Sequence, residues 1–96
     1  MQRILQIKKY GITPDEYDVM FAKQEGKCAA GKQAETHRNQ FGIVSLAVDH
    51  DHLTGDVRGL LCGRCNRSLG LLQDSVRNIQ GLLEYRSKFK KRGEAL

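Results

Sequence analysis

The sequence predicts a small α+β domain in which a β-hairpin and the helix after it form the centre, with further helices on both sides. β-branched and apolar residues at 43–48 and 57–61 predict two strands, and the turn-forming residues 54–56 (TGD) lie between them. The chain has 96 residues, is 40% hydrophobic and has no tryptophan. It can bury only a modest core, so a structural crosslink would add stability that such a core cannot supply. No internal repeat or linker divides the sequence, and we expect one domain spanning residues 1–96.

The first well-marked helix is predicted to begin near Pro14, where the sequence carries a helix-start motif. Thr13 can cap the helix, Pro14 suits the first helical position, and Glu16 can reach back to complete a capping box. We expect Gly26 to end this helix and residues 2–9 to form a shorter helix before it. Residues at helical spacing form one face that we expect to be buried in the core: Tyr17, Met20, Phe21 and Gln24.

The remaining sequence predicts a loop before the hairpin and two more helices after it. Residues 27–42 are polar and irregular, which is typical of a loop. Residues 66–73 (NRSLGLLQ) can form a helix, and a longer helix is predicted from Asp74 or Ser75 to about Lys91. The longer helix carries apolar residues that we expect to be buried: Val76, Ile79, Leu82, Leu83 and Phe89.

The charge balance favours binding to a polyanion. The chain has 16 Lys and Arg residues against 11 Asp and Glu residues, a formal net charge of +5, and residues 86–92 (RSKFKKR) hold five basic residues and no acidic one. Such a cluster is typical of proteins that bind a phosphate backbone, although an ordinary solvated basic tail has the same composition. No run of about twenty apolar residues occurs, and the N-terminal residues carry charges where a signal peptide would be apolar. We therefore expect a soluble, cytoplasmic protein that does not bind a membrane.

The three cysteines predict a zinc site. In a chain without a secretory signal, an odd number of cysteines favours metal binding over disulfides. Cys62 and Cys65 are separated by two residues, so both thiolates can reach one tetrahedral zinc ion from a tight turn, and Cys28 is the expected third ligand. A thioredoxin-like redox pair is the alternative, but it requires a βαβ unit, which the sequence does not predict.

The fourth zinc ligand is missing from the place where a zinc knuckle would have it. A knuckle would read Cys-x-x-Cys-Gly, whereas residues 28–32 are CAAGK. We expect the fourth cysteine to be absent from the written sequence, between Ala30 and Gly31, because the knuckle survives on both sides of that point. The alternatives are a natural or engineered loss of this cysteine and a different ligand such as His37. Without a fourth side chain, water would complete a weaker site.

Residues 49–52 (DHDH) place ligand-type side chains where the first strand ends. In a regular strand the two aspartates would point to one face and the two histidines to the other, but at a strand end the chain can bend and bring neighbours together. Carboxylate oxygens suit Mg²⁺ or Mn²⁺, a neutral imidazole suits a general base, and the amide oxygen of Asn66 could complete an oxygen site with Asp49. Phosphodiester hydrolysis requires these groups, because a metal ion neutralises the phosphate charge and a base activates water. The alternative is a solvated turn.

Residues 48–70 resemble a known nuclease family. The elements DHDH, TG, VRGLLC and CN occur there in order, preceded by YGITPDEYD and by Cys28. This arrangement is similar to the recombination endonuclease VII branch of the HNH, or ββα-metal, nucleases, which is widespread in bacteriophages. The resemblance implies a zinc-stapled ββα-metal core at about residues 43–73, that is, a hairpin and a helix held together by structural zinc, with flanking N- and C-terminal helices. The three cysteines match three of the family's four zinc ligands.

The resemblance also implies roles for single residues. Asp49 and Asn66 would bind the catalytic divalent cation, magnesium or manganese, and His50 would activate the attacking water. His52 would contact the metal or the scissile phosphate. Arg58, in VRG, could hold a phosphate oxygen or form a salt bridge on the hairpin surface, since arginine serves either purpose.

The resemblance finally implies a metal-dependent endonuclease that nicks or cuts duplex DNA with little sequence preference. The enzyme would act in phage DNA packaging or recombination, in the cytoplasm of the host. The packaging machinery would be a further partner. The chain ends with RSKFKKRGEAL, whereas members that resolve branched DNA carry further dimerising C-terminal helices, so the resemblance leaves junction resolution and the oligomeric state open. The rivals are a non-catalytic zinc-stabilised DNA-binding module and a redox or regulatory zinc protein. The side chains expected to hold the DNA backbone are Arg58, Arg64, Arg67, Lys88, Lys90 and Lys91.

Overall fold

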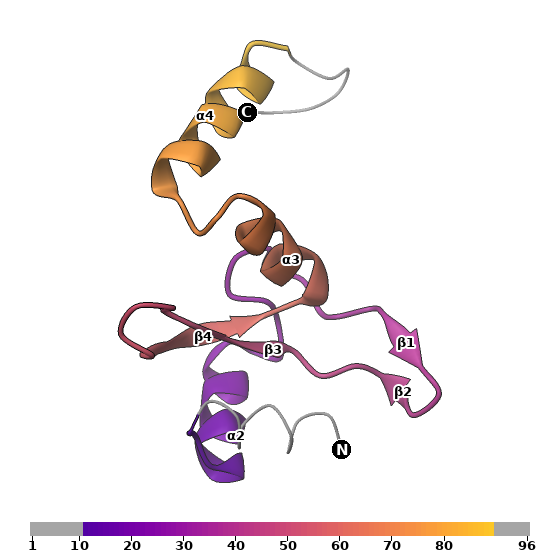
Figure 1. Cartoon of the computed structure of the whole chain (residues 1–96). Coiled ribbons are helices and arrows are strands. Elements are labelled where there is room, and N and C mark those ends of the chain that lie inside the picture. The colour runs from indigo at the N-terminus through magenta and orange to yellow at the C-terminus, as the bar shows by residue number, and fades with distance from the viewer. Residues whose placement is uncertain (1–10, 90–96) are drawn as a thin grey trace. The chain divides into compact units, whose positions relative to one another are not determined.

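The structure, a computed structural model, describes residues 11–89 (Figure 1). Its elements are, in chain order, α2 (Pro14–Lys23), β1 (Arg38–Asn39), β2 (Gly42–Ile43), β3 (Ala47–His50), β4 (Val57–Leu61), α3 (Gly63–Leu71) and α4 (Val76–Ser87). Helices and antiparallel strands occur together, which confirms the predicted α+β class. The helix expected at residues 2–9, and the basic residues Lys90 and Lys91, lie outside the described residues.

The chain divides into two compact units, residues 1–66 and 67–96. The division falls within α3, between Asn66 and Arg67. The expected single domain stays a prediction. None of the helices within residues 11–89 is long and apolar enough to cross a membrane.

Helix α2 begins at the capping box that the sequence predicts. The Glu16 N–H donates to Thr13 Oγ1 at 3.1 Å, and the Thr13 N–H donates to Glu16 Oε1 at 2.9 Å. Tyr17 is the one fully buried residue of α2, and its hydroxyl donates a buried hydrogen bond to the Leu46 carbonyl at 2.7 Å. The expected burial of the whole face is therefore wrong, because Phe21 is 42% exposed.

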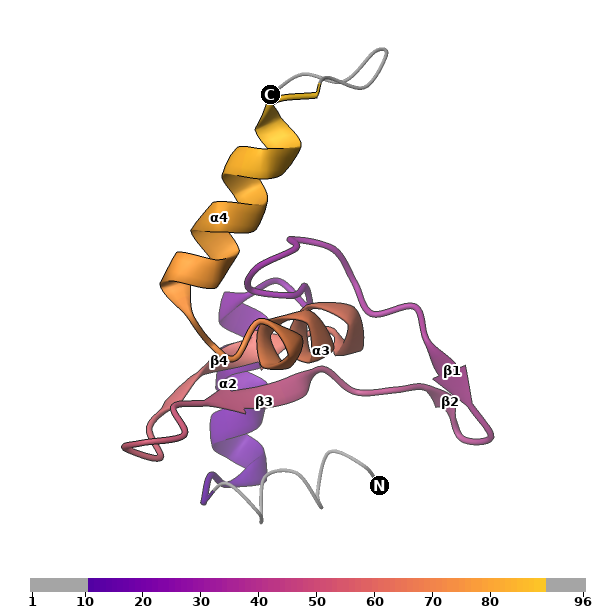
Figure 2. The same cartoon turned by 45° about the horizontal axis from the view of Figure 1, so that its top comes forward.

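The β3–β4 hairpin forms the centre of the first unit, and α2 contacts β4 (Figure 2). The strands are antiparallel, with Val48 opposite Leu60. Side chains of residues directly opposite each other in an antiparallel pair lie on the same face of the sheet. Val48 and Leu60 therefore share the face that packs on Tyr17 and Leu46. The resulting core is small, as the composition predicts.

The strand expected at residues 43–48 is shorter and shifted. Ile43 belongs to β2, residues 44–46 make no strand, and β3 runs from Ala47 to His50. The reason is a second hairpin inside the expected loop, because β1 and β2 pair antiparallel and the Val44 N–H donates to the His37 carbonyl at 2.9 Å. The chain must then cross from one hairpin to the next before it can pair again.

Helix α4 belongs to the second unit and starts where the sequence predicts. Ser75 caps it by accepting a hydrogen bond from the Asn78 N–H at 3.1 Å. The expected burial of its apolar residues is wrong, since their exposed fractions range from 38% to 77%. The spacing of apolar residues shows which face of a helix could be buried, but it does not show whether another part of the protein covers that face. The exposed residues are Val76, Ile79, Leu82, Leu83 and Phe89.

Candidate metal centre and active site

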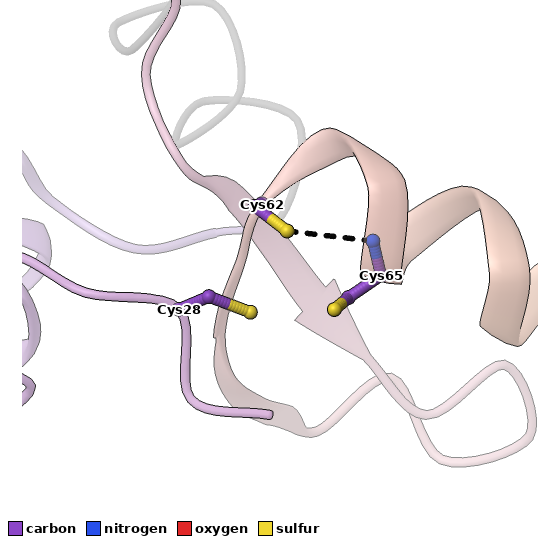
Figure 3. A group of neighbouring side chains, drawn as sticks. All are labelled: Cys28, Cys62 and Cys65. Atoms are coloured by element: carbon purple, nitrogen blue, oxygen red, sulfur yellow. Dashed lines mark hydrogen bonds between the residues drawn. The ribbon is translucent and has the colours of Figure 1, made fainter. Parts of the chain in front are cut away.

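Three cysteine side chains from separate segments of the first unit point toward one another (Figure 3). Cys28 follows α2, Cys62 comes directly after β4, and Cys65 lies in the first turn of α3. All three are free cysteines, and their Sγ atoms lie within 4.8 Å of one another. A tetrahedral zinc ion with Zn–S bonds of about 2.3 Å separates its sulfurs by roughly 3.8 Å. The cluster therefore fits a thiolate-bound metal ion with small adjustments.

Gln24 fixes the loop that carries Cys28 against β4. Its Oε1 accepts a hydrogen bond from the Leu60 N–H at 3.0 Å, and its Nε2 donates to the carbonyl oxygens of Leu60, at 3.0 Å, and Lys27, at 2.7 Å. The Ala29 N–H also donates to the Leu60 carbonyl, at 3.0 Å. The side chain thus pairs with β4 much as a neighbouring strand would. The sequence indicates Gln24 only as a member of a buried face, because helical spacing does not reveal a partner 36 positions away.

Glu35 joins the same loop to the start of α3. Its carboxylate accepts a hydrogen bond from the Gly63 N–H at 2.7 Å and from the Thr36 and His37 N–H groups, both at 3.0 Å. These donors, the Gly63 N–H above all, lower the pKa of Glu35 below its ordinary value of 4.5. A negative charge also suits the N-terminus of a helix. No local pattern predicts this contact, which joins residues 28 positions apart.

Backbone donors and burial also control the ionisation of the cluster. Burial opposes ionisation of Cys28, but the N–H groups around it, including that of Gly31 at 3.3 Å from Sγ, outweigh it and lower its pKa to about 7. Burial, together with the neighbouring sulfurs, raises the pKa of Cys65 to about 11. The Cys65 thiol therefore keeps its proton at neutral pH when no metal is bound, and metal binding would release that proton. His37 is exposed and lies outside the ligand group formed by the described residues.

A β-bulge lies at the DHDH segment. Asp49 pairs with Gly59 and His50 pairs with Val57, so Arg58 is the extra residue of β4. At this bulge Arg58 Nε donates to Asp49 Oδ2 at 2.7 Å and Nη2 donates to Oδ1 at 3.0 Å. Bulges redirect side chains and are frequent beside active sites. The salt bridge that we gave as one of two alternatives for Arg58 is therefore present.

The two histidines of DHDH lie side by side. The ring centroids of His50 and His52 are 4.9 Å apart and the rings are inclined by 62°. His50 is half-buried at the end of β3, whereas His52 is exposed just beyond it. Two adjacent imidazoles form a pair that can bind phosphate or a cation.

Asp51 has a structural role in the turn between β3 and β4. Its Oδ1 accepts hydrogen bonds from the Leu53 N–H at 2.8 Å and the Thr54 N–H at 3.0 Å. These donors, the Thr54 N–H foremost, lower the pKa of Asp51 below its ordinary value. Its backbone N–H donates to the Asp56 carbonyl at 2.8 Å, which closes the turn. Asp51 therefore orders the turn that follows the candidate site.

The other residues expected at the site are exposed. Asn66 lies in the first turn of α3, and its position beside Asp49 stays a prediction. Arg64 is exposed on the same turn of the first unit, and Arg67 and Lys88 are exposed in the second unit.

Comparison with known proteins gives a family match. The model of the family described as recombination endonuclease VII matches residues 3–88. The chain is 41% identical over 80 residues to the Gene 59 protein of Mycobacterium phage D29, covering 82% of this chain and 46% of that protein. It is 42% identical over 77 residues to the Gene 59 protein of Mycobacterium phage L5, covering 79% of this chain and 44% of that protein. The chain thus spans less than half the length of these relatives, and no solved structure matches it significantly. Because the family match covers most of the sequence, the chain belongs to the recombination endonuclease VII family.

Proposed function

We propose that the protein is a metal-dependent DNA endonuclease that hydrolyses phosphodiester bonds. Membership of a nuclease family supports DNA as the substrate. The observation that carries the proposal is the end of the β3–β4 hairpin, where Asp49 lies at the β-bulge and the ring centroids of His50 and His52 are 4.9 Å apart. An acidic oxygen ligand and a titratable base are the two groups that hydrolysis at phosphate requires.

Asp49 and Asn66 would hold the catalytic cation. Both offer oxygen donors, which Mg²⁺ and Mn²⁺ prefer, and the cation would supply positive charge to the scissile phosphate and the leaving oxygen. The two Asp49 oxygens are taken by Arg58, in a pair whose side chains are 14% and 36% exposed respectively. A partly exposed ion pair can exchange partners at small cost. Arg58 would then be released beside the phosphate, where a guanidinium can hold two oxygens.

His50 would take the proton from the attacking water. An imidazole nitrogen can accept a proton from water and return it later, as a general base must. His52, with its ring centroid 4.9 Å from that of His50, would contact the phosphate or the cation. Asp51 lies between the two histidines and would keep His52 in place by ordering the turn to which His52 belongs.

The cysteine cluster would hold structural zinc. Cys28, Cys62 and Cys65 come from a loop, a strand end and a helix start, so one ion would join all three segments. The link matters because the core around it is small. The helix start that zinc fixes also carries Asn66, and β4 carries Arg58.

Basic side chains would hold the DNA backbone without reading its sequence. Arg64, Arg67 and Lys88 are exposed, and phosphate contacts of this kind carry no sequence information. We therefore expect low sequence preference and an affinity that falls steeply with salt. The family match supports a role in recombination, and the phage origin of the relatives supports a setting in the host cytoplasm. In a packaging role, the packaging machinery would be a further partner.

Plasmid relaxation tests the proposal. Supercoiled plasmid is incubated with the zinc-loaded protein and Mg²⁺ or Mn²⁺, and nicked and linear products are quantified. We expect cleavage that requires the added cation and falls on the order of 100-fold or more in His50→Ala, the loss expected for a general base. Gln40→Ala, an exposed residue in the β1–β2 turn, is the matched control. Equal cleavage by His50→Ala and the control would contradict the proposal.

The salt bridge favours one second candidate, a zinc-stabilised DNA-binding module without catalysis. Both oxygens of Asp49 are occupied by Arg58, as expected if the DHDH segment served only the structure. The same experiment separates the two functions. Retarded plasmid with no nicks at any cation concentration would favour the binding module.

A further inference from the structure

We propose that the cysteine cluster has an open fourth corner at Gly31, and that zinc bound there takes its fourth ligand from solution. The ligand would be water, replaceable by a monodentate nitrogen or sulfur donor such as imidazole or a small thiol. This inference rests on the zinc site of the proposed function. It concerns a site separate from the hairpin end at which DNA would be cut.

The position of Gly31 carries the inference. A Cβ atom on Gly31 would lie 3.4 Å from Cys65 Sγ and 3.8 Å from Cys28 Sγ, and these sulfurs are its nearest neighbours. The Gly31 N–H already donates to Cys28 Sγ at 3.3 Å. A side chain at this position would therefore point into the cluster. The loop reaches the fourth corner with its present length, so no inserted residue is needed to bring the chain there.

No other residue can provide a fourth thiolate. The chain has three cysteines, and all three are already in the cluster. Of the three histidines, none joins the ligand group in the described residues. Glycine offers no side-chain ligand atom and leaves the space of a side chain beside the sulfurs. Within residues 11–89 the donor set is thus three thiolates, with one position left for a molecule from solution.

Three thiolates and an open position give zinc a different chemistry from four thiolates. Structural zinc sites are closed by four protein ligands, whereas sites with three protein ligands bind water or another molecule at the fourth position. The charge of the bound group would be −1 with three thiolates, where four would make it −2. We therefore expect a weaker, exchangeable site that the substitution Gly31→Cys closes.

Cobalt spectroscopy tests the inference without any measurement of cleavage. Co²⁺ replaces Zn²⁺ in the full chain, and the visible absorption bands report the number and type of ligands. Imidazole is then titrated into the wild type, Gly31→Cys and Gly31→Ala. The Ala variant is the matched control, because its methyl group fits at ordinary contact distances and Gly31 has no positive φ. Zinc affinity is measured in parallel by competition with a chromophoric chelator.

The wild type is expected to bind one Co²⁺ and to show a saturable spectral shift with imidazole. Gly31→Cys is expected to show no shift and to bind zinc tighter by on the order of tenfold or more, because a fourth thiolate adds binding free energy. Gly31→Ala should gain no affinity. A wild-type spectrum that ignores imidazole and equals that of Gly31→Cys would overturn the open corner while leaving the zinc site standing. Failure of the wild type to bind either metal would overturn the zinc site and the open corner together.

Discussion

Replacing Gln24 with alanine tests whether one side chain joins the metal-binding loop to the central hairpin. The substitution removes three hydrogen bonds, two to the backbone of Leu60 and one to the Lys27 carbonyl. Leu60 is fully buried at 0% exposure, so its N–H loses a partner that water cannot replace. The Leu60 carbonyl keeps the bond from the Ala29 N–H, and the Lys27 carbonyl belongs to an exposed residue.

The expected loss follows from these contacts. An orphaned buried N–H costs about 1–3 kcal/mol, and the exposed bond adds roughly 0.5 kcal/mol. We therefore expect Gln24→Ala to lower the free energy of unfolding by about 2–3 kcal/mol, a large share of the stability of a small domain. Gln24→Glu should lose at least as much, since it keeps the acceptor for the N–H but places a carboxylate against two carbonyl oxygens.

Urea unfolding of the zinc-loaded protein, followed by circular dichroism, measures this loss. Gln40→Ala in the exposed β1–β2 turn controls for the removal of a glutamine side chain. Equal midpoints for Gln24→Ala and Gln40→Ala would refute the reasoning, because the buried N–H of Leu60 would then have found another partner.

Three further substitutions give testable outcomes. Tyr17→Phe leaves the buried Leu46 carbonyl without its donor and should lower the free energy of unfolding by about 1–3 kcal/mol; unchanged urea unfolding would contradict this. Arg58→Ala frees both Asp49 oxygens, so calorimetry should show tighter Mn²⁺ binding, while plasmid cleavage should slow. An unchanged Mn²⁺ affinity would show that Arg58 does not compete with the cation for Asp49. The pKa of Glu35 is lower in the folded than in the unfolded chain, so its stabilisation is present above pH 4.5 and lost as the pH falls through the folded value. Glu35→Gln should therefore be less stable at neutral pH and lose less stability on acidification, and parallel pH profiles would contradict this.

The parts of the fold that the sequence predicts well depend on neighbouring residues. The capping box at Thr13, the helix start at Ser75 and the turn after β3 each form within a few residues, and each occurs where predicted. The cysteine cluster was predicted because the spacing of Cys62 and Cys65 fixes a tight turn.

The parts that were missed depend on contacts between distant residues. Nothing in the pattern of residues 38–43 marks two strands of two residues each, which pair only with one another. The bonds from Gln24 to Leu60 and from Glu35 to Gly63 span 36 and 28 positions, beyond any periodic pattern. The β-bulge at which Arg58 binds Asp49 on the neighbouring strand also depends on how the two strands pair. The alternation of apolar and polar residues in the sequence does not predict it.

Anomalous diffraction from crystals grown with Mn²⁺ tests the central claim most directly, because it locates the cation at the hairpin end. We predict one manganese peak within bonding distance of an Asp49 carboxylate oxygen and the Asn66 amide oxygen, with the Arg58 guanidinium moved off the carboxylate. Manganese absent from Asp49 at saturating concentration, with the ion pair to Arg58 intact, would contradict the account.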